Sequence, residues 1–153
     1  MSRSNYSDEL DYDTLNLYRA NVDRSLAGKR GQAFLREMLA AMDAMPEKRL
    51  IANALEMTTQ AARRNNELLG VARYEAGVCA IGSVGRARSY DLFALDPNDT
   101  ERIGKFFGIA TCMAAEIEYI NDELGLMNET PEQRFIRVRA WVEGLLLPDR
   151  ISE

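Results

Sequence analysis

Hydrophobic side chains recur every three or four residues through most of the chain, which is the spacing of amphipathic helices. The first stripe consists of Leu15, Tyr18, Val22 and Leu26. Asp13 stands where a helix cap belongs, and residues 27–31 (AGKRG) read as a turn after the stripe. We therefore expect a first helix that is capped by Asp13 and stops near Gly28.

Two further helices have clear ends. Residues 32–45 carry apolar side chains at helical steps until Pro46, which cannot continue a helix. The last helix is predicted from Thr130 as its cap, Pro131 in its first position and Gln133 completing a capping box. Its buried stripe is expected to contain Phe135, Val138, Val142 and Leu145, with Trp141 beside it. Pro148 ends this pattern.

A heptad pattern follows the segment LDPND, in which we expect Asp96 to cap a helix and Pro97 to occupy its first position. The apolar positions are Ile103, Phe106, Ala110, Met113, Ile117, Ile120 and Leu124. Steps of three and four over three repeats predict a continuous hydrophobic seam. One long helix and two helices broken at Gly108 both fit this pattern.

The remaining segments are harder to assign. Residues 46–57 fit a short helix or a strand-like turn, residues 58–76 a helix followed by a loop, and residues 77–90 either helix or loop. We predict an all-α, compact single-domain helical bundle of about five to seven helices over residues 13–150, with at most a minor strand element. Residues 1–12 are expected to be an acidic N-terminal tail, with Asp8, Glu9 and Asp11.

The composition of the chain limits the kinds of catalysis and metal binding that it can support. The chain of 153 residues has a formal net charge of −5 and contains no histidine. Histidine is the commonest general base and metal ligand near neutral pH, so its absence excludes Ser-His-Asp and Cys-His catalysis and most zinc sites. We therefore expect no catalytic residues, no metal site and no cofactor. The acidic balance argues against direct nucleic-acid binding.

The sequence also indicates where the protein resides. The polar, acidic start is unlike a signal peptide, and no apolar run is long enough for a membrane span. Cys79 and Cys112 show no pairing signature and are expected to be free, buried thiols. These features predict a cytoplasmic protein without a membrane partner. The glycines Gly77, Gly82 and Gly85 fit neither nucleotide-binding loop pattern and indicate close packing or a turn.

An acidic cluster, Glu116, Glu118, Asp122 and Glu123, lies near the end of the heptad pattern. A single inward-facing seam places Glu118 and Asp122 on the outer face of the helix. Like charges at this spacing and acids at a helix C-terminus both oppose helix stability. The cluster fits a solvated face, a binding surface for a basic partner, or a carboxylate site for a divalent cation.

Arginines and lysines also cluster, at 29–30, 63–64 and 73, 86 and 88, and 134–139. They are interleaved with acids, so solvated faces and intramolecular ion pairs are favoured over nucleic-acid binding. Phe107 and Ile109 flank the heptad seam and widen its apolar band. A wide band flanked by Glu116 and Glu123 fits self-association through helices, and we predict a homodimer.

Several segments are similar to a family of small uncharacterised proteins encoded by phages and prophages of proteobacteria. The matching stretches are GKRGQAFLREMLAAMDAMPEKRLI, CAIGSVGRAR, LDPND, FGIATCMAAEIEYINDE and ETPEQRFIRVRAWVE. Residues 56–77 look longer than the usual connection of that family, so the resemblance implies nothing there. The resemblance brings no catalytic residues. It implies a phage protein that acts by binding a host machine, such as an anti-CRISPR protein.

These observations lead to one main hypothesis and two alternatives. The main one is a non-enzymatic inhibitor that binds a host protein or ribonucleoprotein, most specifically a type I CRISPR surveillance complex. In this hypothesis Glu116, Glu118, Asp122 and Glu123 form the partner-binding surface. The alternatives are a nucleic-acid-binding phage regulator that uses the arginine clusters and a carboxylate-based, metal-dependent enzyme.

Overall fold

The protein folds into helices joined by short connections, and its structure is a computed structural model that describes residues 3, 12–125 and 127–148. The described elements are α1 (Tyr12–Ala27), α2 (Lys29–Ala44), β1 (Glu56–Met57), α3 (Thr59–Leu69), β2 (Gly77–Val78), α4 (Ala80–Ala87), the 3-10 helix η1 (Leu92–Ala94), α5 (Thr100–Phe107), α6 (Thr111–Asp122) and α7 (Pro131–Leu145). The predicted all-α fold with five to seven helices is confirmed, and the strand element is a two-residue ladder.

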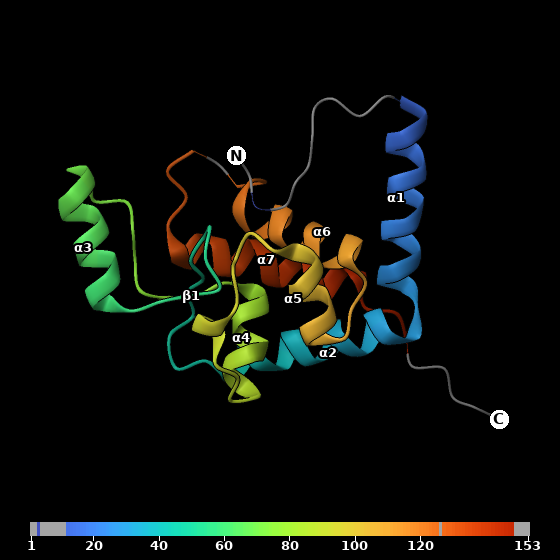
Figure 1. The fold of residues 1–153 in the computed structure, drawn as a ribbon. Coiled ribbons are helices and arrows are strands. Elements are labelled where there is room, and N and C mark those ends of the chain that lie inside the picture. The colour runs from blue at the N-terminus through green and yellow to red at the C-terminus, as the bar shows by residue number, and fades with distance from the viewer. Residues whose placement is uncertain (1–2, 4–11, 126, 149–153) are drawn as a thin grey trace.

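Helix α6 lies at the centre of the molecule (Figure 1). It packs against α1, α4, α5 and α7, while α2 closes the other side by packing against α1, α4 and α7. The core joins side chains from all of these helices, among them Leu35, Met38, Ile81, Ile103 and Ile117, which are almost completely buried. Because neighbours surround α6, it offers no broad outer face to solvent. None of the helices in the described part of the chain is both long and apolar enough to cross a membrane.

The ends of the last helix follow the sequence prediction. Thr130 caps α7, its side chain accepts a hydrogen bond from the Gln133 backbone at 3.1 Å, and the Gln133 side chain accepts one from the Thr130 backbone at 2.9 Å. Pro131 takes the first position of the helix. The second predicted helix is confirmed as α2, which begins three residues earlier than expected and ends before Pro46.

Two predicted helix starts are wrong. Asp96 does not cap a helix, because residues 96–99 form a turn in which the Asp99 backbone donates to the Asp96 carbonyl. Asp99 caps α5 instead, and its side chain accepts from the Arg102 backbone at 3.1 Å. Asp13 lies within the first turn of α1 rather than at its cap. Of the expected acidic tail, Asp8, Glu9 and Asp11 lie outside the described residues.

The heptad pattern belongs to two helices, α5 and α6. Gly108 ends α5 in the left-handed region, with φ of 77°, and the chain turns back before Thr111. The turn places α5 beside α6, so the seam is not continuous, and two of its members, Phe106 and Leu124, are 44% and 52% exposed. Phe107 and Ile109, which suggested self-association, are buried in the core of the same chain. The apolar band therefore packs internally.

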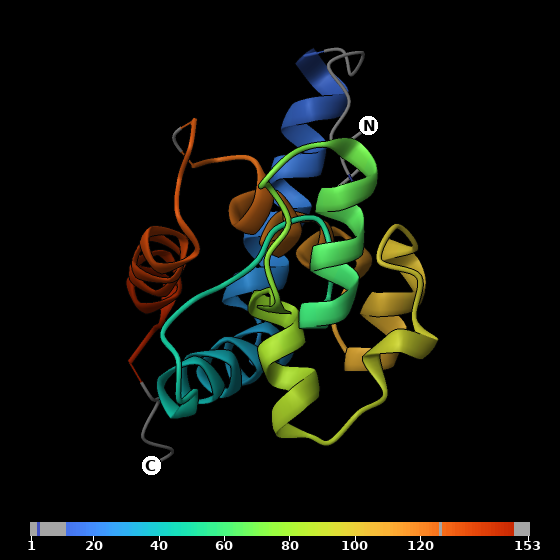
Figure 2. The ribbon, with the colours of Figure 1, turned by 90° about the vertical axis from the view of Figure 1, so that its left-hand side faces the viewer.

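Residues 58–76 form a separate feature, which we call the α3 arm. The strands β1 and β2 pair antiparallel, with Glu56 opposite Val78 and Met57 opposite Gly77, and carry the arm away from the bundle (Figure 1). Only Ala62 of helix α3 is buried. In Figure 2 the arm lies in front of the bundle, between α7 on one side and α5 on the other.

Gly82 lets α4 pack closely against the backbone of the segment before the arm. A Cβ atom at Gly82 would lie 2.1 Å from the backbone oxygen of Leu55. A side chain at this position would collide with that backbone, so only glycine fits. This agrees with the close packing that the sequence indicated.

Candidate functional site

The predicted acidic surface is mostly buried. Glu118 is 1% exposed, Glu116 is buried, and the side chain of Asp122 is only 3% exposed, whereas Glu123 is exposed. The expectation that Glu118 and Asp122 lie on an outer face is therefore wrong. The expectation fails because four helices pack around α6, so no side of the helix faces solvent at these two positions.

Each of the three enclosed carboxylates has an arginine close to it. Glu116 accepts a hydrogen bond at 2.6 Å from Arg19 of α1. Asp122 and Glu118 both face Arg3, whose side chain is 2% exposed. The cluster thus joins distant parts of the chain and is not presented to solvent as an acidic patch.

The guanidinium of Arg3 lies in a buried site that we call the Arg3 socket, made of Cys79, Thr100, Glu118 and Asp122. Arg3 Nε lies 2.5 Å from Asp122 Oδ2, and Nη2 donates to Asp122 Oδ1 at 3.1 Å. The Thr100 hydroxyl lies 3.0 Å from the Arg3 carbonyl oxygen and 3.1 Å from Glu118 Oε2. The two hydrogen bonds to Asp122 form a fork, the geometry that guanidinium and carboxylate prefer.

On the Glu118 side of the socket the hydrogen bonds are incomplete. Arg3 Nη1 and Glu118 Oε1 lie 3.7 Å apart, and neither atom has a hydrogen-bond partner among the described residues. Burial raises the pKa of Glu118 to about 7, against the lowering effects of Arg3 and Thr100, and Asp122 raises it further. Burial opposes the charge of Arg3, but the carboxylates of Asp122 and Glu118 that face it leave its pKa raised, so the guanidinium stays charged.

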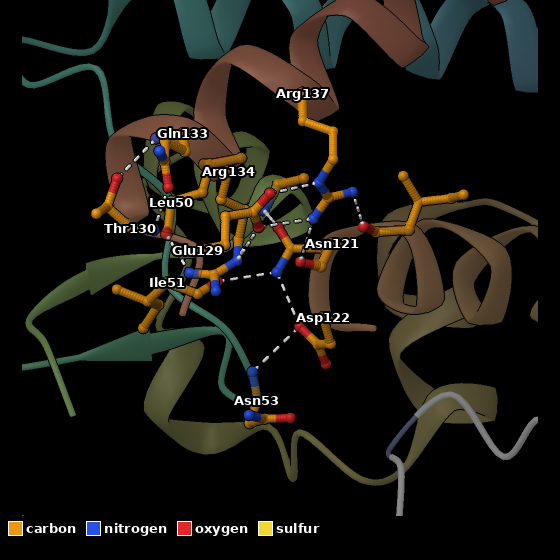
Figure 3. Close-up of polar contacts among 12 residues, drawn as sticks. Leu50, Ile51, Asn53, Asn121, Asp122, Glu129, Thr130, Gln133, Arg134 and Arg137 are labelled. Atoms are coloured by element: carbon orange, nitrogen blue, oxygen red, sulfur yellow. Dashed lines mark hydrogen bonds and ion pairs between the residues drawn. The ribbon is translucent and has the colours of Figure 1, made fainter. Parts of the chain in front are cut away.

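Asn121 connects the socket to the rest of the fold (Figure 3). Its side-chain oxygen accepts from the Ala80 backbone at 3.1 Å, and its amide nitrogen lies 2.9 Å from the Ile51 carbonyl oxygen and 2.8 Å from Asp122 Oδ1. Asp122 Oδ1 also accepts from the backbone of Asn53, which has a positive φ of 64°. One buried amide therefore holds α6, the start of α4 and the segment before β1 together.

Arg134 and Arg137 of the last basic cluster are used inside the protein (Figure 3). Arg137 makes a fork with Glu129, at 2.7 and 2.9 Å, and donates to the Ile120 carbonyl at 2.5 Å. Arg134 donates to the Leu50 carbonyl at 2.9 Å, and its Nε lies 3.4 Å from Glu129. These contacts support the interpretation of intramolecular ion pairs.

The other predicted basic clusters contain some side chains in internal ion pairs and some that are exposed. Arg88 makes a fork with Glu37, both distances being 2.6 Å, and Arg139 makes one with Asp43. Arg86 lies 3.6 Å from Glu56. Exposed basic side chains at 29–30, 63–64 and 73 remain on the surface. Three of these, Arg63, Arg64 and Arg73, belong to the α3 arm.

A polar cavity of about 310 Å³ lies between the base of the arm and the ends of α6 and α7. It is lined by Ile51, Ala52, Asn53, Met57, Arg73, Tyr74, Glu75, Asp122, Asn128, Glu129, Pro131 and Arg134. The guanidinium of Arg73 lies over the Tyr74 ring at 5.6 Å from its centroid. Asp122 is shared by this cavity and the Arg3 socket.

The α3 arm is ordered by its own hydrogen bonds. Thr58 caps α3 and accepts from the Ala61 backbone at 3.0 Å. The Asn66 side chain accepts from the backbones of Arg73 and Tyr74 at 3.0 and 2.8 Å and donates to the Tyr74 carbonyl at 2.9 Å. The returning segment is thereby fixed against the helix. The side chains at the tip, Leu68, Leu69 and Val71, are 76%, 61% and 42% exposed.

The two cysteines have different surroundings. Cys79 is buried at the N-terminus of α4, and its sulfur accepts from the Gly82 backbone at 3.3 Å. Burial raises the pKa of this thiol, although Arg3 and the Gly82 backbone lower it. Cys112 is half-buried, with its sulfur 3.3 Å from the Ser25 hydroxyl. Both are free thiols, as predicted, but only Cys79 is buried as expected.

Comparison of the chain with protein-family models, curated proteins and solved structures gives no match. The resemblance to the phage family therefore stays an expectation from the sequence.

The sequence did not indicate the main partners of the buried carboxylates. Arg3 lies 119 positions from Asp122 along the chain, and Thr100 was expected to lie inside a helix that begins at Asp96. No local signal marked Asn121 either, because a polar residue directly after the seam position Ile120 is equally typical of a solvent-facing site.

Proposed function

We propose that the protein acts by binding a macromolecular partner through the α3 arm, with Leu68, Leu69 and Val71 as its apolar contact. The observation that supports this function is the combination of an ordered helix and an exposed apolar tip. The helix stands away from the bundle on a two-residue ladder and has only Ala62 buried. Exposed apolar groups on a projecting element are typical of protein interaction sites.

The arm gains stability when its exposed apolar side chains are buried against a partner. A helix of eleven residues is marginal in isolation, and most helices in proteins are stabilised by burying an apolar face. Little of α3 is buried in the described structure. Burying Leu68 and Leu69 against a partner would contribute about 1.5–3 kcal/mol for each side chain. Contributions of this size fall in the range of interface hot spots.

The charge of the arm indicates the chemistry of the partner. Arg63, Arg64 and Arg73 are exposed, and of the two arm carboxylates Glu75 is paired with Arg49 of the bundle. The matching surface is therefore an apolar groove with acidic side chains at its rim. The acidic cluster that was expected to bind a basic partner is less suited to this role, because three of its four members lie enclosed next to arginines of the same chain.

In its most specific form, the proposal is that this is a phage-encoded, non-enzymatic inhibitor acting in the host cytoplasm, such as an anti-CRISPR protein that blocks a type I surveillance complex. This form is supported by the resemblance of the segments quoted above and by the absence of histidine. The homodimer also stays a prediction, and sedimentation of the purified chain would measure it.

The arm is tested by replacing both leucines of its tip with aspartate, Leu68→Asp and Leu69→Asp. The variant should fold normally, because both side chains are largely exposed, and should bind its partner at least about 100-fold more weakly. The measurement is the plaquing efficiency of a targeted phage on a host with an active type I system. The wild-type chain should rescue the phage, and the variant should not.

The matched control is the double variant Leu17→Asp and Ile136→Asp, which changes two side chains of similar exposure, 66% and 69%, on α1 and α7. It should rescue the phage as the wild type does. Failure of the wild-type chain against several subtypes would remove the anti-CRISPR form. Binding through the arm would then be tested by capturing partners from host lysate. If the wild type and the arm variant retain the same proteins, the arm is not the binding site.

A further inference from the structure

We propose that the Arg3 socket is a binding site for an alkylguanidinium group of another molecule, and that Arg3 is the occupant supplied by the chain itself. This inference goes beyond partner binding through the α3 arm and does not depend on it. It rests on how the socket is built, on its charge and on the way Arg3 fits.

The walls of the socket belong to the bundle and not to the segment that carries Arg3. Cys79 caps the start of α4, Thr100 begins α5, and Glu118 and Asp122 lie one turn apart on α6. These helices pack against one another around α6, and Asn121 fixes the end of α6 to α4 through the Ala80 backbone. The socket is therefore held in shape by contacts in which Arg3 takes no part.

The charge of the socket suits a guanidinium. Two carboxylates, those of Glu118 and Asp122, face one guanidinium, and the fork on Asp122 is bidentate. A planar guanidinium can serve both carboxylates at once with its five N–H donors, whereas the ammonium of lysine is a compact point charge with a larger hydration shell. The geometry thus selects arginine-like groups over lysine-like groups.

Arg3 does not fill this role completely. Its Nη1 lies 3.7 Å from Glu118 Oε1, too far for a hydrogen bond, and both atoms are buried without a hydrogen-bond partner among the described residues. The Arg3 carbonyl is held at 3.0 Å from the Thr100 hydroxyl, which restrains the backbone at this position. Buried donors and acceptors left unpaired are unfavourable. An alkylguanidinium without this tether can move toward Glu118 and satisfy both atoms.

The test uses the full chain with Arg3→Ala and the probe n-propylguanidinium, which copies the arginine side chain. At pH 8, 10 mM probe should raise the melting temperature of the variant by about 4 °C. n-Butylammonium, which copies lysine at the same charge, should raise it by less than about 1 °C. The wild type should respond by less than about 1 °C to either probe, because Arg3 competes for the socket.

Two results would overturn the proposal: equal shifts with the guanidinium and ammonium probes, or equal shifts for the variant and the wild type. If Arg3→Ala does not fold, Arg3→Gln is the second variant, and refolding of either with propylguanidinium but not butylammonium supports the site. Failure of both variants to fold or to respond counts against it.

A final pair of probes identifies the source of the guanidinium. Acetyl-Gly-Arg-Gly-amide should stabilise the Arg3→Ala chain as propylguanidinium does if the natural ligand is an arginine side chain of a protein. A shift with propylguanidinium alone assigns the site to a small guanidinium compound. The corresponding lysine peptide should have no effect in either case.

Discussion

Replacement of Asn121 by leucine is expected to lower the free energy of unfolding by about 4 kcal/mol, because it leaves several buried groups without hydrogen bonds. The Ala80 backbone N–H and the Ile51 carbonyl both lose their contact with the Asn121 side chain, and Asp122 loses one of its donors. Leucine has the same branching pattern as asparagine but is larger, so the loss combines the missing hydrogen bonds with a packing cost. Urea unfolding followed by circular dichroism measures it.

The control for this change is Asn21→Leu on the exposed face of α1. This variant should differ from the wild type by less than about 0.5 kcal/mol, as is usual for surface substitutions. A loss of less than about 1 kcal/mol for Asn121→Leu would show that the amide does not hold α6 to α4 and to the segment before β1.

Replacement of Glu118 by glutamine is expected to change how stability depends on pH. The pKa of Glu118 is raised to about 7 in the folded chain from an ordinary value of 4.5, first by burial and also by Asp122, with Arg3 and Thr100 opposing. Between these two pH values the folded state holds a proton that the unfolded state has lost. The contribution of Glu118 therefore becomes less favourable as pH rises from about 4.5 to 7, by about 3 kcal/mol in all.

Glutamine carries no titrating proton, so Glu118→Gln should lack this dependence. The difference in unfolding free energy, variant minus wild type, should rise by about 2–3 kcal/mol between pH 5 and pH 8. Glu67→Gln, an exposed change on α3, should give the same difference at both pH values. A Glu118→Gln difference that is constant with pH would mean that the carboxyl does not titrate in this range.

The elements that could be predicted from sequence are those with local signals. The capping box at Thr130, the stop at Pro46 and the helical spacing of the apolar residues each depend on residues a few positions apart. The helix followed by a loop that was predicted for residues 58–76 is confirmed, but its projection from the bundle could not be predicted, because α3 is polar along most of its length and its two leucines do not face the core. The start at Asp96 failed because the same Asp-Pro pattern also forms a turn.

The candidate site was hidden for a different reason. The heptad pattern describes a helix with one buried seam, and on that assumption Glu118 and Asp122 face solvent. Helix α6 has neighbours on several sides, so polar positions outside the seam are also buried. Their ion-pair partner, Arg3, lies far away in the sequence. No local pattern contains that information.

The pairing of β1 with β2 makes residues 58–76 a modular unit. Met57 and Gly77 are opposite one another in an antiparallel ladder, so the chain leaves and re-enters the bundle at neighbouring points. A two-residue reverse turn can join such a pair of strands. Evolution or a protein engineer could therefore excise, lengthen or exchange this segment without rethreading the helices around α6. The same adjacency would allow the segment to be transplanted into a hairpin of another scaffold.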